Sequence, residues 1–193
     1  MPNVPRLNRY LGKRHLASTC AVLALAALSA CGSDDKASTP ATTTVAPATT
    51  TTAPATKIVV TSTAFVDNGP IPSRYTCEGG NAVVPVAWTG IPDNTVSVAL
   101  VVHDPDAPLP GGFLHWLVLG LPPSDGSIPP VPVTARQLAN GAGQPLWTGP
   151  CPPAGPLHHY RFTVYALNKD VQTQDEIAAA TIAQGTLVGT YRR

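Results

Sequence analysis

Basic residues are scarce in this sequence, which argues against several classes of function. Charged residues make up 12% of the 193 residues, with 12 Lys+Arg against 11 Asp+Glu. Four of the basic residues precede Cys31, so the remainder holds eight basic residues and all 11 acidic ones, a net charge near −3. A weakly acidic chain has no electrostatic basis for binding nucleic acid or an anionic lipid surface.

Several catalytic and cofactor motifs are also missing. The sequence has no Gly-rich phosphate loop, no zinc-type pair of Cys-x-x-Cys units and no internal repeat. No Ser or Cys lies in a recognisable nucleophile motif. These gaps favour a binding protein over an enzyme.

The first 30 residues have the composition of an export signal. A basic region precedes an apolar run over residues 16–30, which is shorter than the about 20 residues of a membrane span. Leu28-Ser29-Ala30-Cys31 resembles the bacterial lipobox, so we predict a lipoprotein signal peptide over 1–30 and lipidation at Cys31. An ordinary signal peptide cut after Ala30 and a retained anchor are alternatives, and Cys20 is a weaker lipidation candidate. All of these export the domain, and lipidation places it outside the cell membrane on a lipid anchor.

Residues 31–56 differ in composition from the rest of the chain. Ser, Thr, Ala and Pro dominate, and no apolar periodicity remains. Such a segment cannot bury enough apolar surface to offset the entropy of ordering, so we predict a disordered tether. Residues 57–193 are then one domain, long enough for a single core.

Two cysteines lie inside this domain. An exported protein meets an oxidising environment, so Cys77 and Cys151 predict a disulfide. Closing a loop of this length stabilises a chain by roughly 4 kcal/mol in the chain-entropy model. Two free thiols are the alternative.

The apolar pattern of the domain indicates short strands with Pro and Gly between them. A helix is predicted over 173–183, with Thr173 and Glu176 at capping-box spacing and Gly185 as the C-cap. Residues 124–147, rich in Gly and Pro, are predicted to be a long surface excursion. The pattern favours a mainly antiparallel β-sandwich with one late helix. The predicted strands are 57–65, 82–88, 96–103, 116–121, 160–167 and 187–191.

Polar residues gather where these apolar runs begin or end. Asp104 and Asp106 follow one strand, and His115 precedes another. Asp and Pro also favour a plain turn, and a lone His is more often structural, so both alternatives stay open. Because successive strand residues face opposite ways, His158 and Tyr160 share a face and His159 points to the other. The stiff loop at 149–153 completes a candidate pocket or, alternatively, is a rigid corner that carries the disulfide.

Several ordered motifs in the domain resemble one known family. They are DPDAP at 104–108, HW at 115–116, GPCPPAG at 149–155 and HHYRFTVYAL at 158–167, with YTCEGGN at 75–81 near the start. Together they are similar to the phosphatidylethanolamine-binding protein (PEBP) family, and specifically to its bacterial YbhB/YbcL, or Raf-kinase-inhibitor-like, branch. Glu78 stands where that branch usually has Asp, which leaves the ligand's identity open.

This resemblance implies a two-sheet Greek-key β-fold with an anion-binding pocket at one end. The family pocket accepts phosphate-like or acetate-like groups, including phospholipid head groups, and no cofactor or metal is expected. The implied partner is a small phosphorylated or carboxylated ligand. Carried over by position, the ligand-binding residues are Asp104, Asp106, His115, Gly149, Pro152, Pro153, His158 and Tyr160.

Two other functions remain as alternatives. Family precedent makes a secreted serine-protease inhibitor possible, with a protease or another extracytoplasmic protein as its partner. Asp104, Asp106, His115 and His158 could instead hold a metal or act as general acid and base in a hydrolase.

Overall fold

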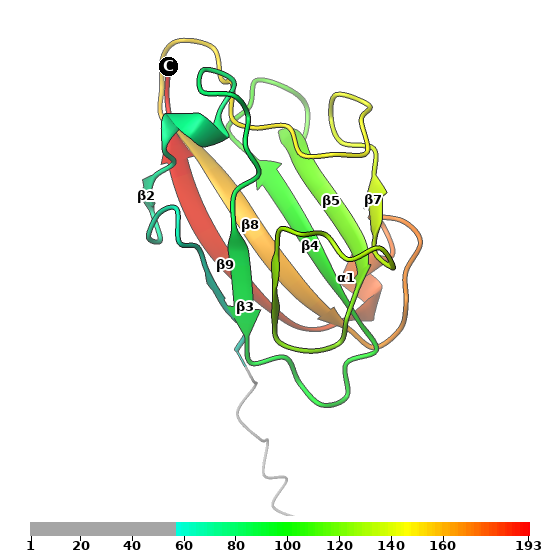
Figure 1. Cartoon of the computed structure of the whole chain (residues 1–193). Helices are drawn as coiled ribbons and strands as arrows, with labels where there is room; N and C mark the ends of the chain where they lie inside the picture. The colour runs from blue at the N-terminus through cyan, green and yellow to red at the C-terminus, as the bar shows by residue number, and fades with distance from the viewer. Residues whose placement is uncertain (1–56) are drawn as a thin grey trace, which may run out of the picture. The chain divides into compact units, whose positions relative to one another are not determined.

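The computed structural model describes residues 57–193 (Figure 1). The predicted signal peptide, the tether and the lipidation site at Cys31 lie outside these residues. No helix within the described part of the chain is long and apolar enough to span a membrane.

Two β-sheets form the domain. The small sheet has the order β1 (Val59–Thr61), β3 (Val86–Thr89), β6 (Gly126–Ile128), and both of its pairings are antiparallel. The large sheet has the order β2 (Gly69–Pro70), β9 (Thr181–Tyr191), β8 (His158–Leu167), β4 (Ser97–Asp104), β5 (Phe113–Leu121), β7 (Arg136–Leu138). Its pairings are antiparallel except for the short parallel pair of β2 with β9. The mainly β, two-sheet fold predicted from the sequence is confirmed.

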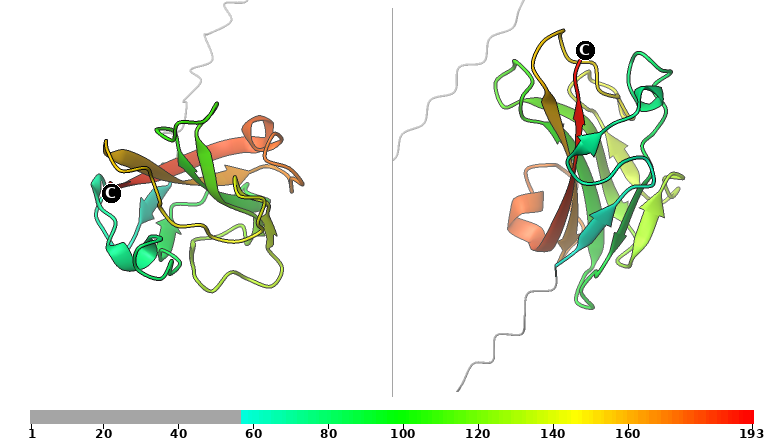
Figure 2. Two further views of the ribbon diagram at one scale, coloured as in Figure 1. Left: turned by 90° about the horizontal axis from the view of Figure 1, so that it is seen from above. Right: turned by 90° about the vertical axis from the view of Figure 1, so that its left-hand side faces the viewer.

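The sheets pack face to face, and the main core lies between them (Figure 2). From β4, Val98, Leu100 and Val102 point into this core. The intervening Ala99 and Val101 belong to a second cluster on the outer face, where α1 (Ile177–Ala180) packs. Burial on both faces explains why β4 is an unbroken apolar run rather than an alternating one.

Residues 124–147 are more ordered than a surface excursion. β6 is an edge strand of the small sheet, and β7 is an edge strand of the large one. Ile128 and Trp147 are buried in the core. The prediction missed both strands because each has only three residues. Conversely, the predicted strand over 57–65 is reduced to β1.

The predicted helix over 173–183 is wrong in extent. α1 spans only Ile177–Ala180, and β9 begins at Thr181. Gly185 is not a C-cap, because it lies within β9 opposite Val164. The Glu176 side chain accepts hydrogen bonds from the Thr173 hydroxyl (3.1 Å) and from the backbone N–H of Gln172 (3.2 Å). These bonds stabilise a turn before the helix and do not form the predicted capping box.

Candidate ligand-binding site

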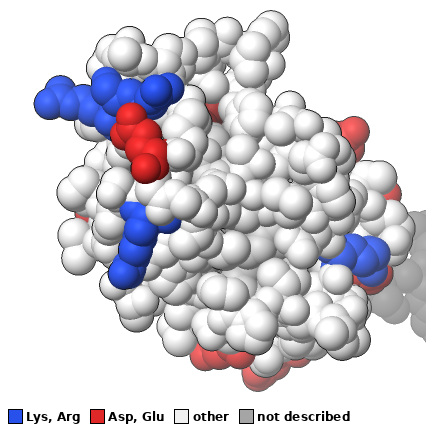
Figure 3. Space-filling model, turned by 45° about the horizontal axis from the view of Figure 1, so that its top comes forward, with Lys and Arg blue, Asp and Glu red and all other residues white. Residues whose placement is uncertain are grey.

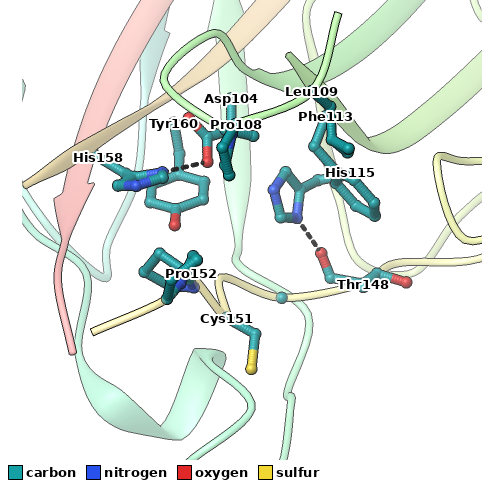
Figure 4. Close-up of a pocket in the computed structure, with 13 residues that line it drawn as sticks. Asp104, Pro108, Leu109, Phe113, His115, Thr148, Cys151, Pro152, His158 and Tyr160 are labelled. Atoms are coloured by element: carbon teal, nitrogen blue, oxygen red, sulfur yellow. Dashed lines mark hydrogen bonds and ion pairs between the residues drawn. The ribbon is translucent and has the colours of Figure 1, made fainter. Parts of the chain in front are cut away.

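The polar residues singled out above meet at one end of the large sheet, which we call the cavity end. β4 ends there at Asp104, while its antiparallel neighbours β5 and β8 begin there, at Phe113 and His158. A cavity of about 280 Å³ opens at this end (Figure 4). Its lining residues are Asp104, Ala107, Pro108, Leu109, Phe113, His115, Thr148, Gly149, Cys151, Pro152, Pro153, His158 and Tyr160.

A buried His–Asp pair forms one side of the cavity. His158 Nδ1 lies 2.8 Å from Asp104 Oδ2, and both side chains are only 4% exposed. The other carboxylate oxygen of Asp104 accepts a hydrogen bond from the backbone N–H of Asp106 at 2.9 Å. With both oxygens engaged, the carboxylate is fixed and also holds the His158 ring in place.

His115 faces this pair from β5. Its Nδ1 lies 2.6 Å from the carbonyl oxygen of Thr148. A carbonyl can only accept, so Nδ1 carries a proton and Nε2 is the ring nitrogen left for a ligand. Edge-on contacts with the rings of Phe113 and Tyr160 fix the imidazole further. Burial lowers the pKa of His115, although the Thr148 hydrogen bond and the charge of Asp104 oppose this shift.

The hydroxyl group of Tyr160 has no hydrogen-bond partner among the described residues, although it is buried. Burial, with a smaller contribution from the charge of Asp104, raises the pKa of Tyr160 and keeps the phenol protonated. An unpaired buried hydroxyl costs about 1–3 kcal/mol, so its usual partner is an internal water or a ligand.

Apolar groups surround this polar centre. Pro108, Leu109 and Phe113 contribute from the β4–β5 side, and Pro152 and Pro153 from the loop opposite. Neither Lys nor Arg is among the described residues that line the cavity. Figure 3, with this end turned forward, likewise shows a mostly uncharged surface. The imidazoles are therefore the lining groups that can become cationic.

Loop 149–153 is fixed by three contacts. A disulfide joins Cys151 to Cys77, with their Cα atoms 5.4 Å apart. The backbone N–H of Gly149 donates to Asn81 Oδ1 at 2.6 Å, and that of Cys77 donates to the Pro150 carbonyl at 3.1 Å. A Cβ at Gly149 would come within 2.4 Å of both Asn81 Oδ1 and the Tyr75 carbonyl oxygen, so only glycine fits here.

Seven of the eight predicted ligand residues line the cavity, and Asp106 does not. Its carboxylate turns outward and accepts from both the Nδ1 and the backbone N–H of His159, at 2.8 Å each. This contact lowers the pKa of Asp106. Asp106 is displaced because the 104–106 turn directs one carboxylate inward and the other outward. His159 lies outside the cavity lining, on the face opposite to His158 and Tyr160.

Sequence reasoning missed several residues that shape the cavity. Leu109, Phe113 and Thr148 line it. Asn140 supports Thr148, because its side-chain amide donates to Thr148 Oγ1 and to the Leu146 carbonyl, both at 2.8 Å. Its side-chain oxygen accepts from two backbone N–H groups of the same loop. The Asn140-Gly141 dipeptide was a turn signal that could have indicated this role.

Residues 61–192 match the family model described as phosphatidylethanolamine-binding protein. The chain belongs to the phosphatidylethanolamine-binding protein family. Among curated proteins, this PEBP is 42% identical to the UPF0098 protein Rv1910c of Mycobacterium tuberculosis over 145 residues, 69% of this chain and 70% of that one. It is also 38% identical over 146 residues to the M. tuberculosis protein named "Putative lipoprotein LppC", covering 69% and 72% of the two chains.

Solved structures agree with the family. E. coli YbcL, described as a member of the mammalian PEBP family, superposes with a TM-score of 0.67 at 29% identity, covering 71% of this chain and 99% of YbcL. The PEBP homolog CT736 of Chlamydia trachomatis gives 0.65 at 32% identity, covering 72% and 99%.

Residues 57–193 contain no group of three or more His, Cys, Asp or Glu side chains placed to hold a metal ion. Of the four residues considered for a metal or hydrolytic site, Asp104, His115 and His158 line the cavity, whereas Asp106 does not.

Proposed function

We propose that this PEBP is a binding protein whose cavity holds a small phosphate- or carboxylate-bearing group, such as a phospholipid head group. The observation that carries the proposal is the pair of histidines, His115 and His158. In each ring Nδ1 is bonded to the protein, while Nε2 has no partner among the described residues. Two imidazole nitrogens at a small, largely apolar cavity suit one compact polar group.

The charge balance predicts how an anion would bind. Asp104 already brings one negative charge to the cavity, and no guanidinium or ammonium group among its described lining residues offsets it. A bound anion therefore favours a protonated His115, whose pKa is lowered in the empty site mainly by burial. The groups that act on this ring are the Thr148 carbonyl, Asp104, His103 and His158. Because binding takes up a proton, affinity should rise as pH falls towards the pKa of His115.

Calorimetric titration of the full chain in detergent with inorganic phosphate, phosphoethanolamine and acetate tests this proposal. His115→Ala should weaken binding roughly 5- to 150-fold, as expected for a lost hydrogen bond to a charged group. His159→Ala is the matched control, because that imidazole lies outside the cavity, and it should bind as the wild type does. Absence of saturable binding in the folded wild type would contradict the proposal.

We further propose that the domain is exported and lipid-anchored through Cys31. The lipobox-like sequence supports this, as does the similarity to a protein named as a lipoprotein. Cys31→Ser should abolish incorporation of radiolabelled palmitate and move the protein from the detergent phase to the aqueous phase. Unchanged labelling, or labelling lost only in Cys20→Ser, would refute Cys31 as the site.

Serine-protease inhibition is a second candidate, favoured by the disulfide-fixed loop 149–153. A rigid loop loses little entropy on binding. However, Pro150 and Pro152 are buried, so a protease could reach only Cys151 and the residues from Pro153 onward. Inhibition of a panel of serine proteases at micromolar concentration tests this candidate, and no inhibition would eliminate it.

A further inference from the structure

A second concave surface lies on the outer face of the large sheet, away from the cavity. It has a volume of about 700 Å³. Gly111, in the β4–β5 connection, borders one end, and Gln174, just before α1, borders the other. Figure 2 (right) shows these two segments standing out from the sheet face with the strands between them. We call this surface the outer groove.

Cross-strand pairing sets its floor as a regular grid. Arg161 on β8 lies opposite His103 on β4 and Val188 on β9. The next row towards α1 has Thr163 between Val101 and Thr186, and the row after that places Tyr165 beside Gln184. Three adjacent strands at about 4.8 Å spacing make the floor about 10 Å wide.

Polar side chains dominate the groove. Seven of its ten lining residues carry a polar side chain, namely His103, Arg161, Thr163, Tyr165, Gln174, Gln184 and Thr186. The hydroxyl groups of Thr163 and Thr186 already bond each other at 3.0 Å, and His103 Nε2 bonds the Gly111 carbonyl at 2.7 Å. The Gln174, Gln184 and Thr186 side chains are exposed and carry both donors and acceptors.

Arg161 brings a positive charge to the groove that no acidic lining residue neutralises. It is exposed, and its guanidinium makes no ion pair or hydrogen bond with any residue of the described domain. None of the lining residues is an Asp or Glu. A guanidinium with all its donors free, directly opposite an imidazole, forms a ready partner for a carboxylate or sulfate group.

These features point to one class of occupant. An extended peptide would bind along a sheet edge, where backbone groups are free, but the middle strand of this floor, β8, is paired on both sides with β4 and β9. The available groups are side-chain hydroxyls, amides, one cation and the half-buried Tyr165 ring. That combination matches a hydroxyl-rich ligand with flat apolar ring faces and an acidic substituent. We propose that the outer groove binds a short acidic oligosaccharide, with its carboxylate on Arg161 and a sugar ring over Tyr165.

Calorimetry on the full chain with trigalacturonate tests the proposal, with maltotriose as the neutral comparison. The chain should be held in a polyoxyethylene detergent, because sugar-based detergents would compete. Saturable binding of trigalacturonate is expected, at least tenfold tighter than maltotriose. Arg161→Gln should weaken it at least fivefold, and Thr186→Val should weaken it by a smaller factor.

Two matched variants identify the site. Arg192→Gln removes an exposed arginine outside the groove and should leave the affinity unchanged. His115→Ala alters the cavity alone, so it should also bind trigalacturonate normally, which separates this proposal from the one for the cavity. Three outcomes would overturn it: no saturable binding, equal affinity in Arg161→Gln and wild type, or tighter binding of triglutamate than of trigalacturonate.

Discussion

The domain contains two His–Asp pairs of equal length and different burial, and these give a direct test of what burial contributes. His158 Nδ1 lies 2.8 Å from Asp104 Oδ2, and His159 Nδ1 lies 2.8 Å from Asp106 Oδ2. The first two side chains are 4% exposed, whereas the second two are 45% and 40% exposed. The pairs are neighbours in sequence, so the exposed pair is a matched control for the buried one.

The expected magnitudes depend on the groups that each substitution leaves behind. Asp104→Asn keeps one acceptor oxygen and turns the other into a donor, although two donors, His158 Nδ1 and the Asp106 N–H, meet this carboxylate. Losing a hydrogen bond to a charged group and leaving a buried donor unpaired together cost about 3 kcal/mol. We expect a coupling energy between Asp104 and His158 of about 1.5–3 kcal/mol. The exposed pair should couple by less than about 1 kcal/mol.

Urea denaturation of six variants and the wild type measures both coupling energies. The buried cycle uses Asp104→Asn, His158→Gln and the double variant, and the exposed cycle uses Asp106→Asn, His159→Gln and their double. Each coupling energy is the departure from additivity within its cycle. Additive effects in the buried cycle, to within about 0.5 kcal/mol, would refute the structural role assigned to the Asp104–His158 pair.

Other perturbations give equally definite expectations. Burial lowers the pKa of His115, so at acidic pH the unfolded chain takes up a proton on this ring more readily than the folded one. The free energy of unfolding, measured relative to His115→Gln, should therefore be constant above about pH 7 and fall below it by up to about 1.4 kcal/mol per pH unit. Denaturation curves recorded at a series of pH values measure this difference. Tyr160→Phe removes a buried hydroxyl without a partner in the described domain, so urea denaturation should find the variant more stable than wild type by about 1–3 kcal/mol, whereas a loss of stability would reveal a bound internal water. Cys77→Ser opens the loop closed by Cys151 and should cost roughly 4 kcal/mol, seen as a lower Tm, with no change if the disulfide does not form in solution. Gly185→Ala would place a Cβ 2.0 Å from the Ile58 carbonyl oxygen and should destabilise by about 1–3 kcal/mol in the same assay, and a neutral effect would contradict this packing.

The sequence predicted the central strands well because their signal is local. β4 is a continuous apolar run ended by Asp104 and Pro105, and β8 is rich in aromatic and β-branched residues. Such patterns report burial directly. The large sheet and the meeting of Asp104, His115, His158 and Tyr160 follow from these strands being neighbours.

The helix prediction failed because tertiary pairing outweighed a local signal. The alanines at 178–180 favour a helix locally, but pairing the residues from Thr181 onward with β8 extends the large sheet, with Thr181 opposite Leu167. Gly185 is then needed for the close approach of the Ile58 carbonyl rather than for a cap. Neither contact can be inferred from the residues near position 180.

The cavity wall was predicted less completely than its polar centre. Asp104 and Asp106 look equivalent in sequence, and only the geometry of the turn shows that one carboxylate faces in and the other out. The Thr148 carbonyl, which fixes the proton on His115, belongs to a backbone group and leaves no sequence signal.

The place where the chain enters the domain affects how a ligand would arrive. Lys57, the first described residue, lies beside Gly90, which is in the connection between β3 and β4. This connection is at the end of the domain where β4 begins, whereas the cavity lies at the opposite end, where β4 ends. If the N-terminal side is fastened to a membrane, the mouth of the cavity lies at the end of the domain opposite the point of attachment. A ligand in solution, or on the surface of a neighbouring structure, then reaches the cavity without passing the point of attachment.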